Sequence, residues 1–220
     1  MNAIAVPRFL GSTVGKKMVM AVTGTILFLF VIGHMIGNLQ LYKGAESLNS
    51  YAELLHSKPP LLWAVRLVML ATVLAHIVTA IQLTRGKRAA RPVPYDMRTF
   101  RKASYASRMM MVGGVALLLF IIYHLLHFTT GTTHPDFQSS SVYANVVAGF
   151  TNVPASLAYI LAMVALGFHL HHGGTSLFQT MGASHPRYNG VIETVTLVAT
   201  FAVVVANISF PLAVLLGLVQ

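Results

Sequence analysis

Histidine is the residue type in this sequence whose placement points most clearly to chemistry. The chain of 220 residues contains ten histidines, and seven of them fall within long apolar stretches. A polar side chain at membrane depth is costly unless a partner holds it, and a neutral imidazole is a common metal ligand. The seven are His34, His76, His124, His127, His169, His171 and His172, whereas His56, His134 and His185 fall in predicted loops.

The composition is typical of a polytopic membrane protein. Apolar residues make up 55% of the chain and charged residues only 9%, and the mean hydropathy is +0.70, far from an ordinary soluble domain. The chain has no cysteine, which excludes Cys-ligated iron–sulfur clusters and covalently attached c-type haem on this chain. The formal net charge of +10 comes almost entirely from residues outside the apolar stretches. It therefore indicates membrane topology, not nucleic-acid binding.

Five apolar stretches predict an all-α membrane protein with five transmembrane helices. Each stretch has the ~20 residues that a helix needs to cross the hydrocarbon core. In lipid the backbone N–H and C=O groups must bond to one another, which favours a helix for each stretch. We expect one transmembrane domain over residues 1–220, with a polar loop at 129–152 and a tight turn at 185–189. The predicted helices cover about residues 17–41, 61–85, 106–129, 153–180 and 190–217, and the last, rich in Val and Leu, is expected to be a packing helix.

The distribution of basic residues predicts the orientation. Twelve Lys and Arg fall in the N-terminal arm, in residues 85–108 and at Arg187, whereas the opposite side carries Lys43 and Lys58, with Arg66 just inside the second stretch. Cytoplasmic loops carry the excess of Lys and Arg in membrane proteins. The N-terminus is therefore predicted to be cytoplasmic and the C-terminus to lie outside.

The histidines of the first four stretches fall at two matched depths. At about 1.5 Å per residue, His34 and His124 each lie about 25 Å from the cytoplasmic edge, and His76 and His169 each lie about 22 Å from the outer edge. The two levels are about 15 Å apart. Two facing imidazoles on different helices are what bis-histidine haem ligation requires, and the core of a helix bundle supplies a dry pocket. The first four helices are thus expected to form a haem-binding bundle.

Small residues near these histidines leave room for a flat macrocycle. Thr23 and Gly113 each lie eleven residues before an outer-level histidine, which places them at the inner level on the same helix face. Gly173, Thr72 and Ala80 lie one turn from the inner-level histidines. The same residue types also serve ordinary helix packing in membranes, so this pattern alone does not distinguish a cofactor site from a packing interface.

Three alternatives to haem ligation are open at this point. Each histidine could be a buried side chain that is hydrogen-bonded to a neighbouring helix. His169 and His172 could bind zinc, but no carboxylate lies deep in a stretch to complete a catalytic site. A haem-free transporter with intramembrane histidines is a stronger rival, although such proteins usually have broken helices and deep acidic residues as well. All five acidic residues here fall in loops or at the ends of stretches.

Four stretches together carry a resemblance to a known family. The chain resembles the single-chain, di-haem cytochrome b anchor of succinate:quinone oxidoreductases and fumarate reductases (complex II) over essentially its whole length. The stretches are Gly33–Asn38, Leu74–Leu83, Ile121–Phe128 and Gly167–Gly182. The resemblance implies that His34 and His124 ligate the iron of an outer haem, and that His76 and His169 ligate that of an inner haem. His172 is the reserve for His169, which is preferred because Gly173 occupies a position that the family keeps small.

The resemblance also implies cofactors, partners and a role. The cofactors are two haem b, with menaquinone or ubiquinone as the bound substrate. A flavoprotein subunit and an iron–sulfur subunit dock on the cytoplasmic side, where the basic residues 85–108 are the expected docking surface. The chain is then the electron-transfer and quinone-reactive subunit of a respiratory enzyme in the tricarboxylic acid cycle, with no dicarboxylate catalysis of its own. The expected location is the bacterial cytoplasmic (inner) membrane, whose lipid bilayer is a further partner. Nucleic acid is not an expected partner.

The quinone pocket is less well defined by the sequence. Quinone chemistry needs hydrogen-bonding or protonatable groups, and Arg66 and His127 are candidates for contacts with haem propionates or quinone. Glu53 and His56 are candidates for the quinone site. Arg66 could instead extend to the membrane interface, and Glu53 and His56 could belong to a solvated amphipathic loop. The alternative functions are a cytochrome b anchor of a hydrogenase or formate dehydrogenase and the haem-free transporter.

Overall fold

The structure, a computed structural model, describes residues 9–90 and 105–220, and every regular element in these residues is helical. Five of the helices are long and apolar enough to span a membrane, so the predicted all-α membrane fold is confirmed. The spans are α2 (Thr13–Asn38, continued by the 3-10 helix η1, Leu39–Lys43), α4 (Pro59–Ala89), α5 (Tyr105–Phe128), α7 (Val153–Thr180) and α8 (Pro186–Leu215).

The ends of the spans follow local capping chemistry, which the apolar pattern does not contain. The hydroxyl of Ser12 accepts a hydrogen bond from the backbone N–H of Gly15 (3.0 Å), so α2 begins before the predicted residue 17. The tight turn predicted at 185–189 is wrong, because α8 begins at Pro186. His185 Nδ1 accepts from the backbone N–H of Arg187 (3.1 Å) and caps this helix. Side chains that accept from the first free N–H groups of a helix stabilise its start.

Two short helices lie between the spans at one end of the molecule. Helix α3 (Ala45–His56) occupies the connection between α2 and α4, and α6 (Val142–Thr151) occupies part of the predicted polar loop at 129–152. The prediction of a polar loop is wrong for 142–151. This segment is apolar, Ser141 caps its first turn, and the amide of Asn145 exchanges two hydrogen bonds of 2.7 Å with the backbone of Gln138.

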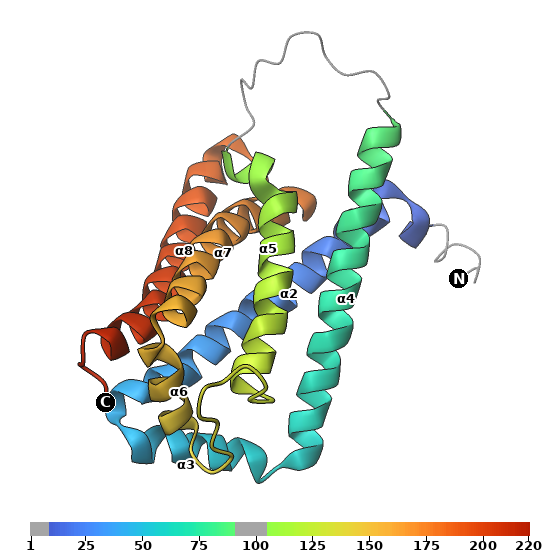
Figure 1. Cartoon of the computed structure of the whole chain (residues 1–220). Helices are drawn as coiled ribbons and strands as arrows, with labels where there is room; N and C mark the ends of the chain where they lie inside the picture. Colours follow the sequence, from blue (N-terminus) through green and yellow to red (C-terminus); the bar gives the residue numbers. More distant parts are fainter. Residues whose placement is uncertain (1–8, 91–104) are drawn as a thin grey trace.

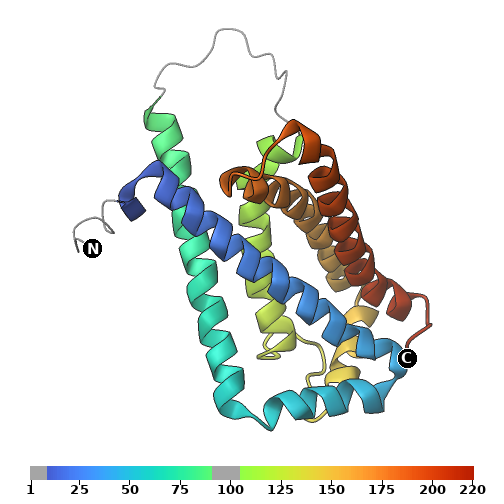
Figure 2. The same cartoon turned by 180° about the vertical axis from the view of Figure 1, so that it is seen from behind.

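Figures 1 and 2 show α3 and α6 at one end of the bundle, with the chain's C-terminus beside them, and the C-terminal end of α4 at the opposite end. We name the end formed by α3 and α6 the outer end, after the predicted orientation. The opposite end, which carries Lys17, Lys87 and Arg88, is named the inner end. The main buried apolar cluster lies at the outer end, where Leu41, Leu48, Phe150, Tyr159 and Phe210 pack together.

The spans pack as two groups with α2 between them. Helix α2 packs along α4, α5 packs along α7, and α7 packs along α8, whereas α2 also contacts α7 and α8. In both views α2 runs obliquely across the bundle, and α4 stands apart from α5 (Figures 1 and 2). This arrangement leaves the interior faces of α2, α4, α5 and α7 directed towards one another.

Candidate functional site

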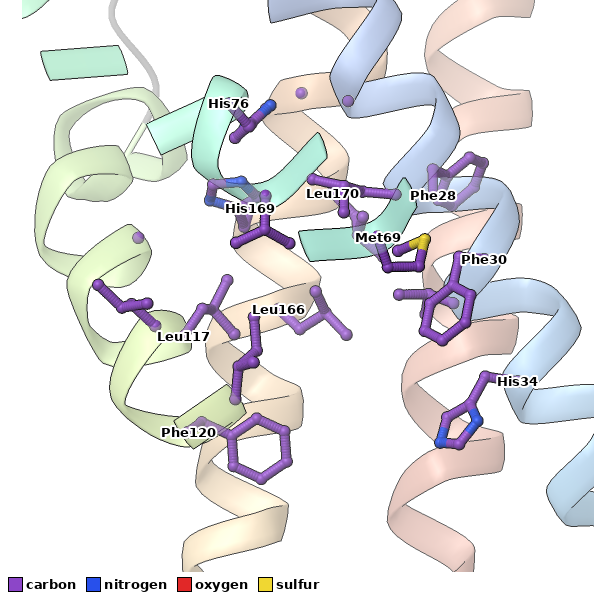
Figure 3. A pocket seen from close by; sticks show the side chains of 18 of the residues that line it. Phe28, Phe30, His34, Met69, His76, Leu117, Phe120, Leu166, His169 and Leu170 are labelled. Atoms are coloured by element: carbon purple, nitrogen blue, oxygen red, sulfur yellow. The ribbon is translucent and has the colours of Figure 1, made fainter. Parts of the chain in front are cut away.

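A large cavity lies between α2, α4, α5 and α7. Its volume is about 3240 Å³, which is several times the ~300–1,000 Å³ of pockets for drug-sized ligands. Between its two ends the wall is apolar, with Phe28, Met69, Leu117, Leu166 and Leu170 among its residues (Figure 3). Of the described residues that line it, none is acidic. A large cavity with an apolar wall suits a large, mainly apolar cofactor.

The four predicted ligand histidines all line this cavity, each from a different helix. His34 and His124 face each other towards the outer end, with ring centroids 5.8 Å apart and planes at 82°. His76 and His169 face each other towards the inner end, with centroids 6.2 Å apart and planes at 56°. Figure 3 shows His76 beside His169, and His34 well removed from both. The structure therefore brings together the same two pairs that the depths predict.

Aromatic rings surround the outer pair. Phe30 stacks on His34 with centroids 5.6 Å apart and planes at 7°. Phe120 and Phe128 each lie 5.9 Å from the ring of His124. On the far side of His124, its Nδ1 atom lies 3.2 Å from the hydroxyl of Tyr159. Most of these rings lie around His124, whereas His34 is exposed.

A hydrogen bond with Thr23 orients the ring of His76. The hydroxyl proton of Thr23 is donated to the carbonyl oxygen of Val19 (2.7 Å), and Thr23 Oγ1 lies 3.1 Å from His76 Nδ1. With that proton given to Val19, Oγ1 is left to accept, which assigns the proton of His76 to Nδ1. The Nε2 lone pair of His76 is thus free to bind a metal. Orientation of a ligand imidazole through its other nitrogen is a common feature of metal sites.

The inner pair is the less satisfied of the two. His169 Nδ1 is a buried atom without a hydrogen-bond partner in the described structure, and such an atom costs free energy. The neighbouring His172 has its Nε2 atom 3.3 Å from the hydroxyl of Ser176. The ring paired with His76 is that of His169, and His172 also borders the cavity.

Small residues leave open space at the inner pair. A Cβ atom added at Gly173 would meet no atom within 4 Å, and one added at Gly24 would meet His76 Cε1 at 3.5 Å. Both glycines border the large cavity, as does Ala80, whereas Gly113 borders a separate cavity of about 240 Å³ beside His169. Thr72 donates to the carbonyl oxygen of Val68 (2.7 Å) within its own helix.

The two pairs fit an axially ligated haem iron better than a metal held by protein alone. Metal–imidazole bonds are about 2 Å long and a ring nitrogen lies about 1 Å from its centroid, so one metal between two facing rings places the centroids about 6 Å apart. The measured separations are 5.8 and 6.2 Å. Within residues 9–90 and 105–220, no group of three or more His, Cys, Asp or Glu is placed to hold a metal ion. Two histidines suffice for a haem, since the macrocycle supplies the remaining ligands.

The remaining predicted site residues fall into different surroundings. Arg66 borders the cavity, with its guanidinium 5.1 Å from the centre of the Trp63 ring. His127 is only 1% exposed, and its Nδ1 atom lies 3.1 Å from the hydroxyl of Tyr159. Glu53 and His56 are exposed on α3 and are not among the described residues that line the cavity.

The predicted docking surface at 85–108 lies mostly outside the described residues, because 91–104 are not described. Its described part includes Lys87 and Arg88, which border the inner end of the cavity.

Sequence reasoning missed Tyr159, although a signal was present. A tyrosine in the outer half of the fourth apolar stretch, ten residues before His169, carries a hydroxyl that needs a partner when it is buried. The helix on which that partner lies depends on how α5 and α7 pack, and spacing within one helix does not give this.

The fold and the site define a class: an α-helical membrane protein with five spans, in which four helices direct two histidine pairs into one cavity. The family model described as "Succinate dehydrogenase/Fumarate reductase transmembrane subunit" matches residues 87–207, more than half of the chain. The chain therefore belongs to this family. The matched region contains His124 and His169, whereas His34 and His76 precede it. The comparisons with curated proteins and with solved structures give no match.

Membership of this family gives the chain a general role. It is a membrane-anchor subunit of a succinate dehydrogenase or fumarate reductase complex, an oxidoreductase that takes part in electron transport. It associates with the other subunits of that complex and with the membrane. The family match does not support the alternative function, a cytochrome b anchor of a hydrogenase or formate dehydrogenase.

Proposed function

We propose that this chain is the di-haem cytochrome b type of anchor subunit, in which His34 and His124 would hold the iron of an outer haem b and His76 and His169 that of an inner haem b. The observation that carries the proposal is the meeting of four histidines, from four helices, as two facing pairs in one apolar cavity. When bound, each haem supplies a one-electron carrier. The chain would contribute the histidine nitrogens that ligate the iron, their orientation and the exclusion of water.

The residues at the ends of the cavity extend the proposal. Haem propionates are anionic, and the described charged residues that line the cavity are all basic. Arg66 is the proposed partner of a propionate or of quinone, and His127 contributes through its hydrogen bond with Tyr159. Menaquinone or ubiquinone is the proposed bound substrate. Glu53 and His56 are the weakest candidates for its site, because they lie on the exposed face of α3.

The charge distribution supports the proposed orientation, and the family supports association with the other subunits of the complex. Lys17, Lys87 and Arg88 lie at the inner end, and the excess of basic residues marks the cytoplasmic side. We infer that the flavoprotein and the iron–sulfur subunit dock there, and that the whole chain is one multi-pass domain of the bacterial cytoplasmic membrane. The absence of cysteine means that any clusters belong to a partner subunit.

The test is a dithionite-reduced minus oxidised absorption spectrum of the complex purified through this chain. The proposal predicts the bands of b-type haem, with two haems for each copy of this chain. A complex that contains the chain and its partner subunits but shows no haem bands would overturn the haem assignment. It would leave the family membership intact.

A further inference from the structure

A buried tyrosine connects the outer ligand to a second histidine that faces away from the cavity centre. The hydroxyl of Tyr159 on α7 lies 3.2 Å from His124 Nδ1 and 3.1 Å from His127 Nδ1, both on α5. Tyr159 is 6% exposed, and the rings of Phe120 and Phe150 each pack edge-on against it with centroids 5.0 Å apart. The hydroxyl is therefore held at one place, with two imidazole nitrogens as its neighbours.

Proton counting allows two arrangements of this network. A tyrosine hydroxyl has one proton to donate and oxygen lone pairs to accept with. Between two Nδ1 atoms, it donates to one imidazole and accepts from the other. If it donates to His124, that ring carries its own proton on Nε2 and cannot ligate a metal through this atom. If it donates to His127, His124 carries its proton on Nδ1 and its Nε2 lone pair is free.

The surroundings of His127 are consistent with the second arrangement. The ring of His127 packs against that of His134, with centroids 5.1 Å apart. His134 Nδ1 accepts from the backbone N–H of Asp136 (3.0 Å), so its Nε2 carries the proton and donates to the carbonyl oxygen of Asn145 (2.8 Å). Both nitrogens of His134 are thus engaged elsewhere, so neither bonds to His127, and the described hydrogen bond of His127 Nδ1 is the one with Tyr159.

We propose that Tyr159 is the positioning residue of the outer haem ligand: its hydroxyl accepts the Nδ1 proton of His124 and donates its own proton to His127. This inference rests on the proposed haem ligation. It gives His127 the role of an acceptor in place of the predicted contact with a haem propionate or quinone. A hydroxyl that donates onward is a better acceptor, and a ligand imidazole whose second nitrogen donates a hydrogen bond is more basic. A more basic ligand favours the ferric iron and lowers the reduction potential.

The test is a potentiometric titration of the haems in the whole purified complex, with Tyr159→Phe compared with the wild type. Loss of one hydrogen bond is expected to move the ferric/ferrous equilibrium of the outer haem about 3- to 10-fold towards ferrous iron. This change raises its midpoint potential by about 30–60 mV. The inner haem should not shift, and both haems should be retained. His34→Ala identifies the outer haem as the titration wave that disappears.

Tyr123→Phe is the matched control, because Tyr123 stacks on His127 with centroids 5.3 Å apart, whereas the hydroxyl that bonds to His124 is that of Tyr159. This control should leave both potentials unchanged. His127→Phe removes the acceptor of the tyrosine proton, so it should raise the same potential by a smaller amount, and it serves if Tyr159→Phe does not assemble. If Tyr159→Phe and His127→Phe both retain two haems with unshifted potentials, the inference alone is overturned. A wild-type complex without haem would overturn the proposed function and the inference with it.

Discussion

The outer and inner histidine pairs differ in how the chain holds them. At the outer pair, Phe30 stacks on His34, and Tyr159 bonds to His124 within an aromatic cluster. At the inner pair, His76 has a hydrogen-bond partner, as His124 has at the outer pair, while His169 Nδ1 is buried without one in the described structure and Gly173 faces open space. One pair is built with large rings, and the other with small residues.

This difference indicates that the two sites depend on a cofactor to different degrees. At the outer pair, His124 lies against Tyr159 of the main buried cluster, so its ring is oriented by packing that exists without a ligand, whereas His34 is exposed. The inner pair is contacted on α2 by Thr23, which lies eleven residues before His34. At 1.5 Å per residue, this spacing places the inner pair about 16 Å from the outer pair along α2. Its open space has to be filled by the group that binds there.

The largest expected effect concerns the inner ligand. His169→Ala should remove one haem from each complex, because the ring that faces His76 is lost. His172→Ala should retain both haems, since the described partner of His172 Nε2 is Ser176. Haem content per complex, measured by extraction, distinguishes the two. Loss of a haem in His172→Ala and not in His169→Ala would exchange their roles.

Substitutions at two adjacent glycines on α7 distinguish an effect on the inner site from an effect on helix packing. Gly173→Leu should fill the open space and lower occupancy of the inner haem while the complex assembles normally. Gly174→Ala should instead weaken the packing of α7 on α8, because the new Cβ would lie 2.5 Å from Thr196 Cγ2. Overpacking of this kind costs about 1–3 kcal/mol. Haem content and thermal stability of the complex check both, and normal haem content in Gly173→Leu would contradict the roomy inner site.

The smallest expected effect is on the reduction potential of the inner haem. Thr23→Val removes the acceptor of the His76 Nδ1 proton and should raise that potential by about 20–60 mV, roughly a two- to tenfold change in a one-electron equilibrium. Thr23→Ser keeps the hydroxyl and should restore the wild-type value. Redox titration of both variants measures this, and an equal shift of the outer haem would show that the two sites are not independent.

Much of the fold could be predicted from the sequence, because lipid imposes simple rules on length and polarity. The five spans are confirmed, including 153–180 at both ends. Helix α6 could not be predicted in this way, since an apolar segment of ten residues is too short to signal a span and its start depends on the cap from Ser141. The start of α8 at Pro186 depends in the same way on a cap, which His185 supplies.

The sequence could predict which histidines share a level, but not their hydrogen-bond partners. Depth along a helix follows from residue number, so His34 with His124 and His76 with His169 could be paired in advance. Spacing marks Thr23 only as a small residue, and it does not single out Tyr159. Their bonds to His76 and His124 cross between helices, so they depend on the rotation of each helix about its axis, which residue spacing does not fix.

The most direct test of the two-pair account is the haem content of two double variants in the purified complex. His34→Ala/His124→Ala removes both ligands of one proposed site, so it should lose one haem and retain the other. His34→Ala/His76→Ala removes one ligand from each site, so it should lose both haems. Equal haem content in the two variants, with both complexes assembled, would contradict the pairing of histidines into an outer and an inner site.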